Sequence, residues 1–68
     1  MTATQFRAML AKAKLSQRGA ARLFKKNERT TRRYATGEWP IPDDIADKLR
    51  KLAAGKITVQ DIADAYAN

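Results

Sequence analysis

Apolar residues recur along the chain at the spacing of α-helices. Near the N-terminus, Phe6, Met9, Leu10 and Ala13 fall on one helical face. Alternating runs of β-branched residues, which are typical of half-buried strands, do not occur in the sequence. The pattern therefore predicts an all-α fold.

Residues that favour helix ends divide this pattern into segments. Thr2 or Thr4 suits the start of the first helix, Ser16 that of the second and Asn27 that of the third, while Gly37 suits the end of the third. Helices are expected near residues 3–13, 17–24, 28–36, 43–54 and 59–66, in a compact four- to five-helix bundle.

The connection from the third to the fourth helix contains two prolines and should be stiff. Trp39 in this connection is expected in the core or at a hinge, with stacking on a sugar as the alternative. Thr58 and Asp61 resemble a capping box at the start of the fifth helix, although aspartate replaces the usual glutamate or glutamine.

Composition limits the function classes. A chain of 68 residues is a single domain, 1–68, and it contains neither cysteine nor histidine. Disulfides and Cys/His zinc sites are excluded, and the side chains best suited to proton transfer and nucleophilic attack near neutral pH are missing. We expect no enzyme activity, no cofactor and no metal. No apolar run approaches the ~20 residues needed to span a membrane, so a cytoplasmic protein is expected.

Charge is divided unevenly along the chain. Residues 1–37 carry ten Lys/Arg and one acid, whereas residues 38–68 carry four Lys/Arg and six acids. This asymmetry indicates an anionic partner for the first half, with a merely solvated basic surface as the alternative.

The expected third helix, residues 28–36, concentrates this charge. On a wheel at ~100° per residue its three arginines share one face, and Thr31 and Tyr34 lie opposite. Such a helix fits the DNA major groove, where arginine pairs bidentately with guanine O6 and N7. Glu28 could accept a hydrogen bond from cytosine N4, serve as a favourable acid in the first helical turn, or brace Arg32. The residues expected to contact bases are Glu28, Arg29, Arg32, Arg33 and Thr36.

Residues 15–42, LSQRGAARLFKKNERTTRRYATGEWPIP, resemble the helix-turn-helix of Cro/C1-type (phage-repressor-like) regulators, in particular the small bacterial and phage members. The positions in register are Ser16, Gln17, Ala21, Arg29, Thr30, Arg32, Arg33, Gly37 and Pro42. The resemblance implies that Gln17 contacts a phosphate or braces the recognition helix. It also implies that the arginine face enters the groove and that Tyr34 takes the place of a buried apolar residue.

Three positions depart from the family pattern. Lys25 stands where the family usually has a turn glycine, and a left-handed conformation there costs a lysine roughly 1 kcal/mol. Lys26 stands at a usually apolar position, so its stem is expected to cover the core. Thr31 replaces an aliphatic residue, and its hydroxyl is expected to bond a carbonyl in the preceding turn. The residues expected to contact DNA phosphates are Ser16, Gln17, Arg18, Lys25, Lys26 and Asn27.

The expected function is therefore that of a sequence-specific regulator of transcription that binds double-stranded DNA. A repressor of its own operon, of phage or prophage type and without an evident small-molecule effector, is favoured. It would bind an inverted repeat as a homodimer, joined through residues 56–68 by Ile57, Val59, Ile62 and Tyr66. Some of these four must pack on the protein's own core, and pairing only on DNA is the alternative. The rival function is an antitoxin that binds a protein toxin and its own promoter. RNA binding has less support, because aromatics able to stack single-stranded bases are lacking.

Overall fold

The chain is described by a computed structural model that covers residues 1–66, all of whose regular structure is α-helical. The helices are α1 (Ala3–Lys12), α2 (Gln17–Leu23), α3 (Glu28–Thr36), α4 (Asp43–Ala53) and α5 (Val59–Tyr66). The predicted all-α class is confirmed, and each helix lies within one residue of its expected bounds. The last two residues of the expected dimerisation element, 67 and 68, lie outside the described residues.

Side-chain caps explain why the helices begin where they do. Thr2, and not Thr4, caps α1: its hydroxyl accepts from Gln5 N at 3.1 Å, and the Gln5 side chain accepts from Thr2 N at 3.0 Å. Ser16 Oγ accepts from Gly19 N at 2.9 Å, and Asn27 Oδ1 accepts from Thr30 N at 2.8 Å. These bonds satisfy amide groups that have no partner within their own helix.

The expected pairing at the start of α5 is also present. Asp61 N donates to Thr58 Oγ1 at 3.2 Å, and Thr58 N donates to Asp61 Oδ2 at 2.9 Å. The shorter aspartate therefore completes the reciprocal bonds that glutamate usually makes.

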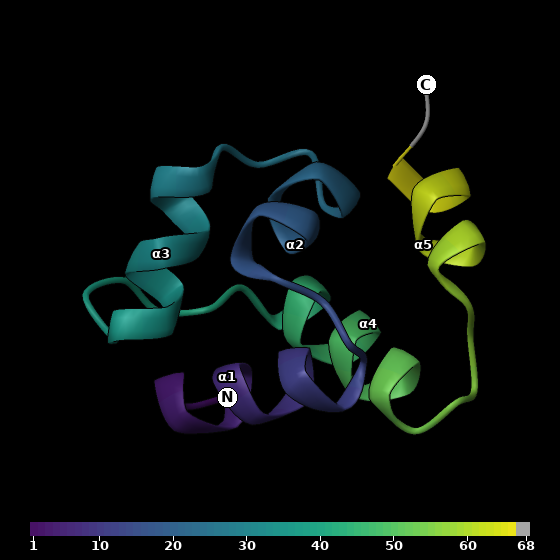
Figure 1. Cartoon of the computed structure of the whole chain (residues 1–68), viewed down its shortest axis with the longest axis horizontal. Coiled ribbons are helices and arrows are strands. Elements are labelled where there is room, and N and C mark those ends of the chain that lie inside the picture. Colours follow the sequence, from purple (N-terminus) through teal and green to yellow (C-terminus); the bar gives the residue numbers. More distant parts are fainter. Residues whose placement is uncertain (67–68) are drawn as a thin grey trace.

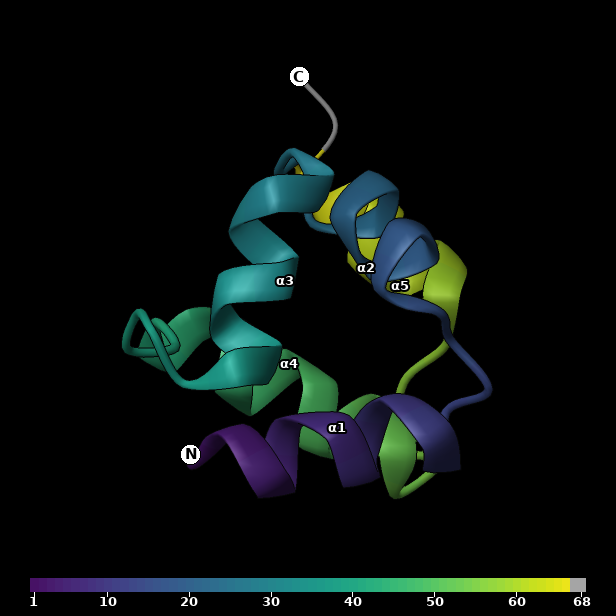
Figure 2. The same ribbon diagram turned by 60° about the vertical axis from the view of Figure 1, so that its left-hand side comes forward.

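The helices pack as a bundle around one core. Figure 1 shows α1 and α4 lying along one end of the molecule, with α3 standing against α1, and α2 at the centre. In the turned view of Figure 2, α5 lies behind α2, against which it packs on the side away from α3. The buried core residues are Phe6, Leu10, Ala20, Phe24, Tyr34, Ala35, Ile41, Ile45, Ala46, Leu49 and Ile62.

Two helices end at a lysine in the left-handed conformation. Lys14 follows α1 with φ 59°, and Lys25 follows α2 with φ 57°. After α2, Lys26 N donates to Ala21 O at 2.8 Å and Lys25 N to Arg22 O at 3.4 Å, which is the Schellman pattern. Lys25 thus adopts the conformation that a turn glycine would adopt at this position. Lys26 is exposed.

The inner face of α5 belongs to the core, which corrects the expected dimer interface. Ile62 is 0% exposed, so it cannot contact a second copy of the folded chain. Tyr66 is partly buried against Phe24, with ring centroids 5.8 Å apart in an edge-to-face pair. Ile57 is half-buried, and Val59 alone of the four residues is strongly exposed, at 49%.

None of the helices within residues 1–66 has the length and apolar character required to cross a membrane.

Candidate nucleic-acid interface

Helix α3 is fixed by its inner face and leaves its outer face to solvent. Thr31, Tyr34 and Ala35 are buried, whereas Arg29 and Arg32 are exposed. We define the outer face of α3 by Glu28, Arg29, Arg32 and Thr36, all of which are exposed. The division follows directly from the helical spacing of polar and apolar side chains.

A buried hydroxyl joins α3 to α2. Thr31 Oγ1 lies 3.0 Å from Glu28 O, in the preceding turn of α3, and 3.1 Å from Gln17 O, at the start of α2. Its single proton serves these two carbonyls, so the predicted bond to the preceding turn is confirmed. Gln17 braces α3 through its main-chain carbonyl, which leaves its exposed side chain available.

The other end of α3 is held by α1. The guanidinium of Arg7 donates to Ala35 O, one of the carbonyls that no helical amide reaches. A cation at this position also offsets the negative end of the helix dipole. The ring of Tyr34 packs edge-to-face on Phe6 of α1, with centroids 5.9 Å apart. The role of Arg7 could not be predicted from a local sequence pattern, because its partner lies 28 residues away.

Two tyrosines remain neutral near physiological pH. Burial raises the pKa of Tyr34, and the charge of Asp44 adds to this. Burial, a hydrogen bond to Asp44 Oδ2 at 3.0 Å and the charge of that carboxylate raise the pKa of Tyr66 to about 12. Neither phenol therefore adds negative charge to the bundle that carries the basic residues.

A shallow hollow on the outer face of α3 is lined by Glu28, Arg29 and Arg32. Glu28 pairs with Arg18 of α2, with Nε and Oε1 2.7 Å apart, and not with Arg32. The proposed brace of Arg32 is therefore wrong, and Arg32 points outward without an acid to hold it among residues 1–66. Both side chains of the Arg18–Glu28 pair are more than half exposed, so the pair is weak and exchangeable.

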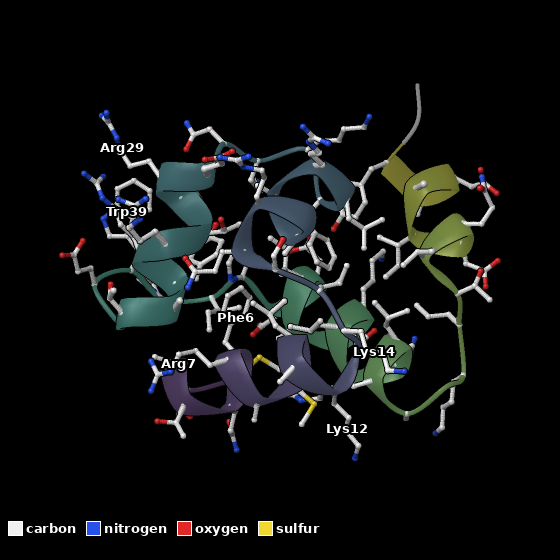
Figure 3. The ribbon with its side chains drawn as sticks, viewed as in Figure 1. Phe6, Arg7, Lys12, Lys14, Arg29 and Trp39 are labelled. Carbon is white, nitrogen blue, oxygen red and sulfur yellow. The ribbon has the colours of Figure 1, made fainter. Side chains whose placement is uncertain are left out.

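Arg33 has a different environment from the other two arginines of α3. Its guanidinium lies over the ring of Trp39, 4.5 Å from the centroid, and its Nε is 3.6 Å from Glu38 Oε2. Trp39 is 44% exposed, so its expected place in the core is wrong. Figure 3 shows Trp39 beside α3, on the same side of the molecule as Arg29.

The residues expected to contact phosphates lie at the two ends of α2 and are all exposed: Ser16, Gln17 and Arg18 at its start, and Lys25, Lys26 and Asn27 in the turn that follows. The turn leads directly into α3, and the Arg18–Glu28 pair holds the start of α2 beside the start of α3. The expected phosphate-contacting residues at both ends of α2 therefore lie near the N-terminal end of α3. Ser16 Oγ and Asn27 Oδ1 are engaged as helix caps, so each has less capacity for a second partner.

Not all of the positive charge belongs to this surface. Lys12 and Lys14 lie at the end of α1, away from Arg29 and Trp39 (Figure 3). Arg29, Arg32, Lys25 and Lys26 form the concentrated part, around the turn and the outer face of α3.

Comparison of this chain with protein-family models, with curated proteins and with solved structures found no match.

Proposed function

We propose that this protein binds double-stranded DNA in a sequence-specific manner through the outer face of α3. The observation that carries the proposal is the anchored helix itself: its inner face is bonded to α2 and its C-terminal end to α1, while Arg29 and Arg32 are exposed on the outer face. A helix held in this way presents its arginines in fixed register, as groove readout requires.

Each side chain of the outer face has a defined role in this proposal. Arg29 and Arg32 donate pairs of hydrogen bonds to guanine O6 and N7 in the major groove. Glu28 exchanges Arg18 for the N4 amine of a cytosine, and Arg18 then turns to the phosphate backbone. Thr36, at the C-terminal end of the same face, contacts the edge of a base.

Contacts to the DNA backbone come from the residues around α2. The side chains of Gln17 and Arg18, at the start of α2, meet one phosphate group, and Lys25 and Lys26 meet a second beyond the turn. These contacts orient α3 in the groove and contribute affinity for any sequence.

The biological role that we propose is repression of transcription. The resemblance to Cro/C1-type regulators supports a phage or prophage repressor that binds an inverted repeat as a pair of protomers. A protein of this kind represses by occupying the promoter, in the simplest case that of its own operon.

Arg32→Ala tests the reading role of α3. The test uses a duplex recovered by repeated selection from a randomised pool and a scrambled duplex of equal composition. Loss of a bidentate contact should weaken binding to the selected duplex by about 1–3 kcal/mol and leave the scrambled duplex nearly unaffected.

Lys56→Ala provides the matched control, because Lys56 is an exposed cation after α4 and its loss changes the net charge by the same amount. Equal affinity of the Arg32→Ala and parent proteins for the selected duplex would refute the proposed function. Failure of the selection to enrich any sequence would refute it as well.

A further inference from the structure

The contacts of Arg33 set it apart from the outer face of α3. On a helical wheel Arg33 lies about 100° from Arg32, at the margin of the basic face. Its side chain is only 36% exposed, because the indole of Trp39 covers one side of the guanidinium and Glu38 meets its Nε. Reaching a base would require Arg33 to leave both partners.

The backbone of the following loop fixes the position of this pair. Gly37 ends α3 in the left-handed conformation with φ 85°, which a residue with a side chain rarely adopts. Trp39 N then donates to Arg33 O at 3.3 Å, and Pro40 follows directly. Trp39 is therefore held beside α3 by main-chain geometry, and its exposed ring surface is a fixed feature of the molecule.

Stacking leaves the hydrogen-bonding edge of the guanidinium free. A guanidinium that lies over an aromatic ring uses its face for that contact, while its N–H groups point outward in the plane. Glu38 Oε2 lies 3.6 Å from Nε, and within residues 1–66 no hydrogen bond engages the terminal amino groups, so these groups are available for an anion. A phosphate matches these groups bidentately.

We propose that Arg33 and Trp39 together clamp the DNA backbone: the guanidinium binds a phosphate and the indole packs on the adjacent deoxyribose. Arg29 and Arg32 are then the arginines that read bases. The inference rests on the proposed function and deepens it, because it divides the arginines of α3 into two classes. Glu38 holds Arg33 in place in the free protein and is displaced by the phosphate.

The clamp makes a specific claim about sequence dependence. A phosphate contact is present on every duplex, so its loss weakens binding to all sequences by a similar factor. A base contact is lost only on the cognate sequence. Arg33 and Arg32 should therefore behave differently although they are neighbours on one helix.

Trp39 supplies a direct readout because it is the single tryptophan of the chain. We would follow its emission and its quenching by acrylamide during titration with the selected duplex and with the scrambled duplex. The clamp predicts protection from acrylamide on both duplexes. Arg33→Ala should lower the affinity for both by a common factor, about threefold to tenfold, and should reduce the salt dependence by about one ion.

Two further variants separate the clamp from simple charge. Arg33→Lys keeps the charge but loses the planar, bidentate contact, so its affinities should lie between those of the parent and Arg33→Ala on both duplexes. Glu38→Gln removes the competing carboxylate and should raise both affinities. Lys56→Ala controls for the loss of one positive charge, and helicity by circular dichroism establishes that each variant is folded.

The outcomes distinguish this inference from the proposed function. If selection enriches no sequence, or if Arg32→Ala binds the selected duplex like the parent, the proposed function is wrong. If Arg32→Ala acts selectively but Trp39 stays equally accessible to acrylamide on DNA, only the clamp is overturned. Loss of affinity in Arg33→Ala on the selected duplex alone would also overturn it and return Arg33 to the base-reading residues.

Discussion

Lys14 and Lys25 occupy backbone conformations that glycine adopts without strain. At each position the next residue donates back into the helix, with Leu15 N to Leu10 O at 2.9 Å after α1 and Lys26 N to Ala21 O at 2.8 Å after α2. The Schellman geometry thus forms despite a cost of about 1 kcal/mol for each non-glycine residue. For Lys25, the adjacent start of α3 suggests a phosphate contact.

Lys25→Gly should separate stability from binding. Relief of the left-handed strain should raise the free energy of unfolding by about 1 kcal/mol, measured by urea denaturation. The same variant should bind every duplex more weakly and with a shallower salt dependence, since one phosphate contact is lost. Lys14→Gly is the matched control, with the same backbone relief at a residue expected to be surface only. If Lys25→Gly retained full DNA affinity, Lys25 would not contact a phosphate.

At the scale of the helices, the features that the sequence predicted are those that depend on near neighbours. The caps by Thr2, Ser16 and Asn27, the Thr58–Asp61 pairing and the bond from Thr31 to its preceding turn all span three residues. Their geometry follows from helix dimensions alone, so a single sequence suffices to place them.

The contacts that the sequence did not predict join different helices. The Arg7 contact to Ala35 spans 28 residues, and the second bond of Thr31 reaches Gln17 in α2. Glu28 pairs with Arg18 and not with Arg32, because the start of α2 lies close to the start of α3. Trp39 was expected in the core or at a hinge, whereas the tight turn after Gly37 holds it at the surface. The packing of the whole core determines which helices contact one another and at what angle, so a local sequence pattern does not predict these contacts.

A hydrogen bond from the phenol of Tyr66 joins α5 to Asp44 of α4, and its contribution to stability should be visible at high pH. The pKa of Tyr66 is about 12 in the folded chain against 10.0 for a free tyrosine, so its contribution to stability is complete below pH 10. Above pH 10 the unfolded chain releases the phenol proton more readily than the folded chain does. Stability should therefore fall between pH 10 and pH 12.

Tyr66→Phe tests this contribution. The variant keeps the ring contact with Phe24 but has no phenol to ionise or to donate to Asp44. Its urea denaturation midpoint should fall less steeply than that of the parent between pH 10 and pH 12. Tyr34, whose pKa is also raised, is present in both proteins, so the comparison isolates Tyr66. Identical slopes for the two proteins would rule out the contribution.

For the molecule as a whole, the division of charge predicts steep salt dependence. Ten of the fourteen Lys/Arg lie within residues 1–37, which contain α1, α2 and α3, whereas α5 carries two acids and no base. If a pair of protomers neutralises about six to ten phosphates, affinity should fall by roughly 10³–10⁵ between 50 and 200 mM salt. Fluorescence anisotropy with a labelled duplex measures this slope. A nearly flat dependence would show that the basic residues do not meet DNA.

The burial of Ile62 changes the expectation for pairing of two protomers. A stable interface buries about 800 Å² on each partner, centred on well-packed apolar side chains. The residues around α5 offer Val59 and parts of Ile57 and Tyr66, because Ile62 is used by the core. We therefore expect a monomer in solution at micromolar concentration and pairing only on adjacent half-sites. Ile62→Asp would unfold the protein and so cannot test pairing, since the substitution buries a charge.

Val59→Asp tests pairing on DNA without disturbing the fold. Val59 is the first residue of α5, where an acid is favourable, and its side chain is exposed. On a duplex with one half-site the variant should bind nearly as tightly as the parent. On an inverted repeat with half-site centres ~10 bp apart it should lose the cooperativity that the parent shows, because two aspartates would then face each other across the two-fold axis. Ala8→Asp, at an exposed position of α1, adds the same charge away from α5 and should retain cooperativity.

Light scattering that gave a doubled mass for the parent without DNA would contradict the expected monomer. Full cooperativity in Val59→Asp would show that the protomers meet through another surface.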